Sequence, residues 1–381
     1  GPDYEQPEAP VPDTWGTAQN AGLLATDYEL VEWWEVFDDP TLNRLVEIAH
    51  AQNYNLKLAG LAVLEARAQL GIAVGAQYPQ QQFISGDVTR IGPSENAGQG
   101  DTSFSQYDLS ASLAWEMDFW GKFRRGIESA DAALQASVAN YDDAMVLITA
   151  QVVSTYVTIR TLEEQLRIAH ENLKLQQRSY DIATVLYKNG QDSELDVQQA
   201  LSLLLNTQAA VPSLEAQVNL SRNAMDTLLG QANGYTETLI SEGPIPDVPK
   251  QIAVGIPADL LRRRPDLRQA ELVAVAQNAQ VGVATANLYP SIALTGSLGV
   301  FSVSRDVGGG GGSNLFESDS IGYTAGASFS WPVLNYGRIR NNVRVQDARL
   351  QQAIVSYQSL ALEAAQEVDD AMESLAGAQA Q

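Results

Sequence analysis

The sequence contains an internal duplication, so any fold for this chain has to hold two copies of one unit. Segments 68–79 and 279–290 are similar and both end in Tyr-Pro, at an offset of 211 positions. A second set of matches has an offset of 216: Trp115 with Trp331, Trp120 with Tyr336, Gly121 with Gly337, Arg124 with Arg340, and Tyr141 with Tyr357. The glycine run 308–312 lies between the two blocks of the second copy and accounts for the difference of five, because loop tips tolerate insertions.

Each copy is predicted to contain two strands. Residues 107–119 and 321–333 alternate between apolar and polar side chains, which indicates strands with one apolar and one polar face. Residues 291–300 alternate in the same way, and residues 82–91 do so weakly. These lengths suit tilted strands that cross a bilayer, which need about 9–11 residues. A soluble β-sandwich would show the same alternation.

Four strands are too few to close a barrel. An open sheet edge in lipid would leave unpaired backbone groups, each costing several kcal/mol. If these strands lie in a membrane, several chains must therefore share one barrel. Asp108, Glu116 and Asp118 fall between the apolar residues of the first alternating segment and are our candidates for charges that face a water-filled lumen.

Long helices are predicted directly after Gly121 and Gly337, where the period changes. The spacing of apolar residues alternates between four and three, which is typical of a coiled-coil seam, at Leu134, Val138, Tyr141, Met145, Ile148 and Val152, and at Leu350, Ile354, Tyr357, Ala361, Ala364, Val368, Ala371 and Leu375. Residues 122–188 contain no proline, and a helix of ~60 residues would be ~90 Å long. We expect a turn at 188–192, a cap from Asp192 or Ser193, and a second helix to about residue 230, broken or kinked near Pro212.

Composition excludes several functions. The net charge of −23 argues against nucleic-acid binding, which needs a basic surface. The chain has no cysteine, and His50 and His170 are far apart in sequence, so no catalytic or metal-binding constellation is predicted. The run 262–264 is basic, and we interpret it as a capping and salt-bridging segment at a helix entry. No run of about 18 apolar residues occurs, so the sequence predicts no transmembrane helix.

Four stretches resemble characteristic sequences of one known family: 1–7, 33–42, 186–196 and 260–271. On these residues the chain resembles the TolC-like outer-membrane efflux proteins, in their OprM/NodT-type lipoprotein branch, over essentially its whole length. The resemblance implies a duplicated strand-strand-long-helix unit. Four strands per protomer would join a shared trimeric β-barrel that continues into a periplasmic α-helical coiled-coil tunnel.

The same resemblance implies a function, partners and a location. It implies a passive exit channel for drugs or other small molecules in the outer membrane of a Gram-negative bacterium, extending into the periplasm. The partners would be a periplasmic adaptor protein, an inner-membrane pump and outer-membrane lipid. No cofactor is implied beyond a lipid anchor on a cysteine upstream of Gly1. The residues expected to contact the adaptor form the helical tip: Tyr187, Lys188, Asn189, Gly190, Asp192, Ser193 and Asp196.

The predicted organisation has four parts. Residues 1–40 form an N-terminal extended segment, 41–230 the first repeat, 231–258 a proline-rich linker, and 259–381 the second repeat. The second repeat lacks a counterpart of the first repeat's helical pair, and we expect the sequence to be a trimmed or incomplete form. The alternative function is a periplasmic coiled-coil structural or adaptor protein, which would carry one helical hairpin beside a small β-domain.

Overall fold

The computed structural model describes residues 3–7, 32–92, 103–241, 243–247, 263–305 and 314–380. The chain divides into two compact units, and each unit takes residues from both copies of the duplication. The strand unit comprises Gly1–Pro10, Val63–Ser137 and Leu267–Leu362. The helical unit comprises Val11–Ala62, Val138–Asp266 and Glu363–Gln381. The glycine run 308–312 and Arg262 lie outside the described residues.

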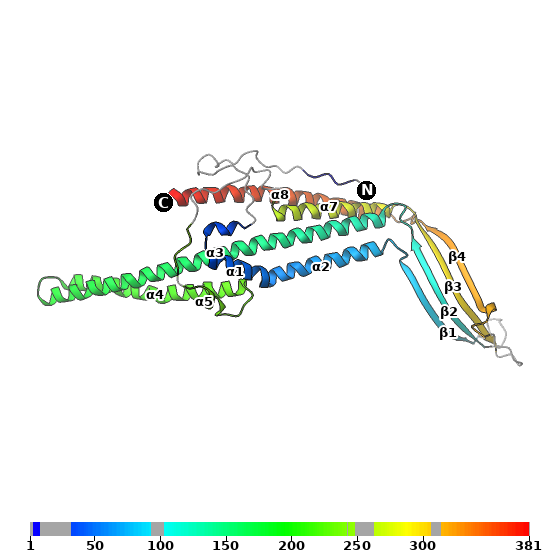
Figure 1. Ribbon diagram of the computed structural model, residues 1–381. Helices are drawn as coiled ribbons and strands as arrows, with labels where there is room; N and C mark the ends of the chain where they lie inside the picture. The colour runs from blue at the N-terminus through cyan, green and yellow to red at the C-terminus, as the bar shows by residue number, and fades with distance from the viewer. Residues whose placement is uncertain are drawn as a thin grey trace. The chain divides into compact units, whose positions relative to one another are not determined.

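The strand unit is built on one antiparallel sheet whose strands follow sequence order, β1-β2-β3-β4 (Figure 1). The strands are β1 (Gln81–Ile91), β2 (Phe104–Glu116), β3 (Ser291–Arg305) and β4 (Ile321–Ser330), with a short 3₁₀ turn η3 (Ser318–Ser320) before β4. All four predicted strands are therefore present. The first of the strongly alternating segments begins and ends three residues earlier than predicted, and β4 ends three residues earlier.

Helices lead into and out of this sheet. They are α2 (Tyr54–Gly75) before β1, α3 (Lys122–Lys188) after β2, α7 (Pro265–Ala286) before β3 and α8 (Arg338–Ala380) after β4. In the strand unit α7 packs against α3, where the Ser129 hydroxyl donates to the Ala276 carbonyl at 2.9 Å. It also packs against α8, where the Gln277 side chain donates to the Gln346 carbonyl at 3.1 Å.

The duplication is repeated in the contacts as well as in the sequence. The indole nitrogen of Trp115 donates to the Gln77 carbonyl at 3.1 Å, and that of Trp331 donates to the Leu288 carbonyl at 3.1 Å. The two tryptophans are 216 positions apart and their acceptors are 211 positions apart, as the sequence matches require. The two copies therefore fold alike where each helix passes into its strand.

One offset differs from the sequence prediction. Gln81 pairs with Ala114 in the first copy, and Ser291 pairs with Ser330 in the second, so β1 and β3 are related by 210 positions instead of 211. The extra residue in the first copy is Gln80. Its side-chain amide accepts a hydrogen bond from the Glu116 backbone N–H at 2.7 Å and donates to the Glu116 carbonyl at 3.1 Å. The Gln80 side chain thus takes the place of one backbone pair.

The helical unit buries one apolar core. Its elements are a 3₁₀ helix η1 (Trp33–Phe37), α1 (Pro40–Gln52), the later part of α3, α4 (Glu194–Leu228) and α5 (Tyr235–Leu239). The carboxylate of Asp39 caps α1 by accepting from the N–H groups of Thr41 and Leu42, and Pro40 occupies the first helical position. The buried core residues are Leu42, Leu45, Val46, Ala49, Leu56, Ile148, Val152, Val153, Tyr156, Ile159, Met225, Leu229 and Ile240.

Two helix predictions need correction. The helix after the turn is not broken at Pro212, because α4 continues through that residue to Leu228, and the alternative of a kink there stays a prediction. The predicted seam of α3 holds at Ile148 and Val152, which are buried, but Val138 is exposed. In that part of α3 the buried residues are the small ones, Ala132, Ala136 and Ala139. A straight helix drifts by ~20° per heptad from a strict seven-residue repeat, so one seam does not stay on the packed face.

Two of the described helices are long and apolar enough to cross a membrane by length and composition alone, α2 with a mean hydropathy of 1.4 and α3 with 1.3. The sequence prediction of no transmembrane helix relied on the absence of an unbroken apolar run, whereas a window can be apolar on average without one, and it stays a prediction. The core helix of a soluble protein passes the same test, so the finding does not place either helix in a membrane. The α2 window is 6% buried and the α3 window 39% buried.

Candidate channel wall and helical tip

The sheet has two chemically different faces, fixed by the strand pairing. Side chains alternate between the faces, and directly paired residues share one. One face is mostly small or polar: Gln81, Ser85, Asp87, Asp108, Ser110, Ser112, Glu116, Thr295, Ser297, Gly299, Thr324 and Ser328. The other is mostly apolar: Ile84, Val88, Leu109, Ala111, Leu113, Leu294, Leu298, Val300, Ile321, Tyr323 and Phe329. Such a sheet can separate lipid on one side from water on the other.

Hydroxyl groups bond one another across the polar face. Ser297 and Thr324 hydroxyls lie 2.8 Å apart, and the Ser110 hydroxyl donates to the Asp108 carboxylate at 3.0 Å. The Asp87 and Asp108 residues are directly paired across β1 and β2, so two carboxylates share this part of the face. Asp87 was missed in the sequence because the alternation of 82–91 is weak.

The three predicted lumen charges occupy different environments. Asp108 and Glu116 lie on the polar face of β2, and Glu116 forms an ion pair with Lys122 at 3.0 Å. Asp118 lies beyond the strand, and its carboxylate accepts from the backbone N–H groups of Phe123 and Arg124 at 3.2 and 2.9 Å. Its side chain is only 9% exposed, so it serves as the cap at the beginning of α3.

A cavity of about 580 Å³ lies where the sheet meets its helices in the strand unit. Charges of both signs line it, from Glu116, Asp118, Lys122 and Arg338, together with the aromatic rings of Trp120 and Tyr289. These two rings stack with centroids 4.7 Å apart, and the Trp120 indole nitrogen donates to the Pro290 carbonyl at 2.8 Å. The stacked pair joins the beginning of α3 to the beginning of β3.

All seven predicted tip residues lie at the turn between α3 and α4. Gly190 has a φ of +71°, the left-handed conformation that glycine adopts readily at a helix end. Ser193 caps α4, and its backbone N–H and the Asp196 carboxylate complete a capping box. Hydrogen bonds from Ser193 hold the pKa of Asp196 below its ordinary value. The sequence predicted this turn and one of its two possible caps, Ser193, correctly.

The tip exposes apolar side chains. Tyr187 is 43% exposed and Leu195 is 65% exposed, on the two sides of the turn. Exposed apolar side chains on both sides of a capped turn are compatible with a contact surface, although exposed apolar residues also occur elsewhere in the described chain. That the tip contacts an adaptor protein stays a prediction.

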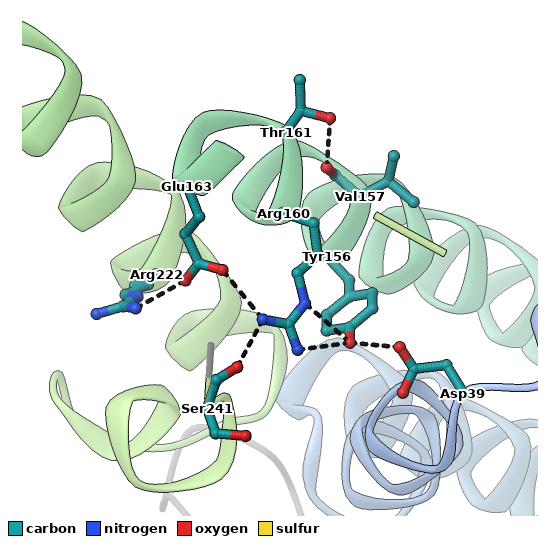
Figure 2. Close-up of polar contacts among 8 residues, drawn as sticks. All are labelled: Asp39, Tyr156, Val157, Arg160, Thr161, Glu163, Arg222 and Ser241. Atoms are coloured by element: carbon teal, nitrogen blue, oxygen red, sulfur yellow. Dashed lines mark hydrogen bonds and ion pairs between the residues drawn. The ribbon is translucent and has the colours of Figure 1, made fainter. Parts of the chain in front are cut away.

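A buried polar network in the helical unit was not predicted from the sequence (Figure 2). The Tyr156 hydroxyl donates to the Asp39 carboxylate at 2.5 Å and accepts from the Arg160 guanidinium at 2.9 and 3.1 Å. Arg160 also donates to Glu163 at 3.0 Å and to the Ser241 carbonyl at 2.6 Å. Burial raises the pKa of Tyr156 to about 12, with the Asp39 bond as a second cause.

This network fastens the linker after α5 to α3. Arg160 is 3% exposed, and Arg222 of α4 bonds the second oxygen of Glu163 at 2.8 Å. A buried guanidinium needs such partners, because an unpaired charge in the interior is strongly destabilising. The isolated arginine in a helical pattern gave no signal of this role in the sequence.

Arg264 of the basic run and His50 have structural roles. Arg264 donates to Asp266 at 2.8 Å and to Glu367 at 2.8 Å, which confirms the predicted salt-bridging role at the α7 entry. The His50 imidazole lies 2.8 Å from the Thr149 hydroxyl, and burial lowers the pKa of His50. No group of three or more metal-ligating side chains occurs among the described residues.

Comparison with known proteins agrees with this geometry. The family model described as "Outer membrane efflux protein" matches residues 45–231 and 256–381. Nodulation protein T of Rhizobium leguminosarum bv. viciae is 34% identical, with 98% of this chain and 74% of that protein aligned. A probable outer membrane lipoprotein, SilC of Salmonella typhimurium, is 31% identical, with 97% and 78% aligned. The structure of the outer-membrane channel OprN superposes with a TM-score of 0.88 at 33% identity, covering 98% of this chain and 82% of that one.

A four-stranded sheet with one apolar face, continued by long helices, defines an outer-membrane channel protein. The chain belongs to the outer membrane efflux protein family. It is the outer-membrane component of an efflux system and extends into the periplasm, as the resemblance in the sequence implied. The alternative of a periplasmic adaptor is not supported, since the matched family and structures are channels.

Proposed function

We propose that three copies of this chain close a twelve-stranded barrel that lets small molecules leave the periplasm through the outer membrane. The observation that supports it is the open sheet. Among the described strands, β1 and β4 each pair on one side only, while the sheet has the apolar face of a lipid-exposed wall. Unpaired edges in lipid cost several kcal/mol per backbone group, which supports closure by further copies.

Two measurements on the detergent-extracted protein test this proposal. Native mass spectrometry should give three times the protomer mass, and reconstitution into a planar bilayer should give stable conductance steps. A water-soluble monomer without conductance would contradict the proposal. Because each copy would contribute its two edge strands, β1 and β4, to the barrel, we expect the oligomer to stay together in mild detergent.

The polar face should favour cations in the pore. Asp87 and Asp108 are paired on β1 and β2, and three copies would form a ring of six carboxylates. Rings of acidic side chains attract cations. The double variant Asp87→Asn, Asp108→Asn should lower the cation-to-anion permeability ratio measured from reversal potentials. Asp118→Asn is the matched control, because the Asp118 carboxylate caps α3. An equal change of the permeability ratio in both variants would contradict the assignment of Asp87 and Asp108 to the pore.

The helical tip is our proposed contact for a periplasmic adaptor protein that links the channel to an inner-membrane pump. Tyr187→Ala with Leu195→Ala should abolish co-purification of the adaptor with the channel. The control variant Leu175→Ala changes a residue of α3 that is as exposed as Leu195 but lies farther from the tip, and it should retain the adaptor. Loss of co-purification with both variants, or with neither, would contradict the assignment of the contact to the tip.

We also propose the lipid anchor expected from the sequence, on a cysteine before Gly1. The likeness to a relative named as a probable outer membrane lipoprotein supports it. Mass spectrometry of the N-terminal peptide of membrane-extracted protein would reveal an acylated cysteine. A free, unacylated N-terminus on that protein would contradict it.

A further inference from the structure

We infer that the cavity at the junction of the sheet and its helices binds small organic anions that carry an aromatic ring, with the Arg338 guanidinium as their cationic partner. The inference rests on the proposed channel and adds a class of molecule that this channel takes up. All residues that line the cavity belong to the strand unit. Its volume of about 580 Å³ is within the usual range of small-molecule sites.

The cavity lies over the polar face of the sheet. Its lining includes Glu116 at the end of β2, Ser291 at the beginning of β3 and Ser330 at the end of β4. Ser291 and Ser330 are directly paired, and Glu116 pairs with Ala293, two residues from Ser291. Every second residue of a strand lies on the same face, so these three side chains share the polar face. In the proposed channel, a solute in the pore would therefore have access to the cavity.

Two cations at equivalent positions of the two copies line this cavity. Lys122 at the beginning of α3 and Arg338 at the beginning of α8 are 216 positions apart. Each helix follows a glycine in the left-handed conformation, Gly121 with a φ of +76° and Gly337 with a φ of +82°. The two helices therefore begin in the same way, and the residues before them decide what each cation contacts.

Only the first copy gives its cation a carboxylate. The Lys122 ammonium forms an ion pair with Glu116 at 3.0 Å. The counterpart of Glu116 in the second copy is Pro332, which also lines the cavity. Among the described residues, the Arg338 guanidinium has no ion-pair or hydrogen-bonding partner. The second copy thus keeps the positive charge and lacks the group that neutralises it.

The beginning of the helix shows the same difference between the copies. In the first copy the Asp118 carboxylate accepts from two backbone N–H groups in the first turn of α3, at 3.2 and 2.9 Å. The counterpart of Asp118 is Leu334, which cannot accept a hydrogen bond through its side chain. No described side chain accepts from the corresponding N–H groups of Ile339 and Arg340. The beginning of α8 is therefore without an acidic cap.

The two missing carboxylates indicate the chemistry of the ligand. A carboxylate from solution could receive two parallel hydrogen bonds from the Arg338 guanidinium. It would also lie near the positive end of the α8 dipole, which favours an anion there. The side-chain amides of Asn287 and Asn342 line the same cavity and provide further donors. The ligand's carboxylate would thus have the role in the second copy that Glu116 and Asp118 have in the first.

An aromatic surface in the cavity favours a ligand with a ring. Trp120 and Tyr289 stack with centroids 4.7 Å apart, and each side chain is still 47% exposed. Both line the cavity, so a planar ring bound there can pack against them. A molecule that combines a ring with a carboxylate therefore uses both features of the site.

Such a site has a specific value in an acidic channel. The paired carboxylates of Asp87 and Asp108 belong to the same polar face, farther along β1 and β2, and they repel anions. A cation without a counter-charge lowers the free energy of an anion beside it. The Arg338 site would therefore concentrate organic anions in a pore whose other charges disfavour them.

Benzoate is the probe for this site, and its binding to the detergent-extracted oligomer can be measured by isothermal titration calorimetry. Benzyl alcohol keeps the ring without the charge, and acetate keeps the charge without the ring. Benzoate should bind about tenfold more tightly than either, because each of the other two lacks one of the contacts. Equal binding of all three molecules would overturn the inference.

Two arginine variants test which side chain holds the anion. Arg338→Gln should weaken benzoate binding about tenfold, because it removes the charged partner. Arg340→Gln is the matched control, since Arg340 is an exposed arginine of the same helix that does not line the cavity. It should leave the affinity for benzoate unchanged. Equal weakening by both variants would mean a general attraction to basic charge and would overturn the assignment to Arg338.

A second pair of variants keeps Arg338 and changes its surroundings. Pro332→Glu introduces the carboxylate that the first copy has at this position, and it should pair with Arg338 and exclude benzoate. Pro332→Gln is the neutral control and should still bind benzoate. Undiminished binding by Pro332→Glu would overturn the inference. This pair also covers the case in which Arg338→Gln does not assemble.

Failure of the site and failure of the proposed channel can be distinguished. Conductance and oligomer mass are measured on the unmodified protein without benzoate. If both are as proposed and benzoate does not bind, the channel stands and the inferred site is wrong. If neither is found, the proposed channel is contradicted and the inference fails with it.

Discussion

The helices α2 and α7 hold equivalent places in the two copies, and both have 22 residues, yet they are buried very differently. In α7 the fully buried residues include Ala274, Ala279 and Val281. Their counterparts in α2 are half-buried or exposed, and Leu61, Leu64 and Ile72 of the same helix are each more than half exposed. The apolar pattern is therefore similar in both copies, while the cover over it is not. A pattern shows that a helix can be buried, and the neighbours decide whether its own chain buries it.

The largest effect is expected from the network that only the first copy has. Its Arg160 corresponds to Ala376 in the second copy. Replacing Arg160 by Met should lower the free energy of unfolding by about 3–5 kcal/mol, because it breaks the buried ion pair with Glu163 and removes the donor to the Ser241 carbonyl. Urea titration in detergent, followed by circular dichroism, measures the change. Arg264→Met, at the partly exposed beginning of α7 in the second copy, should lower the free energy of unfolding by only about 0–1 kcal/mol. Equal losses for Arg160→Met and Arg264→Met would contradict the larger contribution of the first copy's network.

The next effect compares α7 and α2 directly. Leu267→Ala in α7 removes a side chain that is 4% exposed and should cost about 2–5 kcal/mol of protomer stability. Leu64→Ala in α2 removes one that is 60% exposed and should change protomer stability by less than about 0.5 kcal/mol. The same Leu64→Ala should weaken the oligomer, measured as its dissociation on dilution in detergent. If the oligomer is unaffected, α2 has no partner over that residue.

A smaller effect separates the two equivalent glycines. Gly282→Leu should cost about 1–3 kcal/mol in the protomer by overpacking against Arg125. Gly71→Leu should leave the protomer unchanged and shift oligomer dissociation to higher protein concentration. Thermal unfolding measures the protomer stability of Gly282→Leu, and analytical ultracentrifugation measures the oligomer dissociation of Gly71→Leu. A loss of protomer stability in both variants would contradict the different cover of the two helices.

The smallest effect is a pH dependence from the first copy. Burial lowers the pKa of His50, so the unfolded chain binds this proton more readily than the folded one. Stability from this group is complete above about pH 6.5 and falls as the pH decreases below that value. The variant His50→Gln should reduce the dependence of the free energy of unfolding on pH below about pH 6.5. An unchanged slope would show that the imidazole is not held in its neutral form by the fold.

Much of the plan could be predicted from the sequence, because duplication and periodicity are local signals. The alternation around Leu109 and Leu113 gave β2, and the helix beginning at Lys122 was placed correctly. The cap formed by Asp118 could not be told from a lumen charge, since the alternation continues to residue 119 and places Asp118 on the polar face of the predicted strand, which in fact ends at Glu116. The Arg160 network joins residues more than a hundred positions apart, as Tyr156 and Asp39 are, and no spacing rule reaches that far.

The Gln80 side chain has a consequence for how the two copies can diverge. A strand that slips by one residue exchanges its two faces, and here that would turn carboxylates toward lipid. By bonding both backbone groups of Glu116, Gln80 lets the first copy carry one more residue than the second without such a slip. The segment before β1 therefore accommodates a difference of one residue in length between the two copies. A change of one residue in length at this point leaves the polar and apolar faces of the sheet in place.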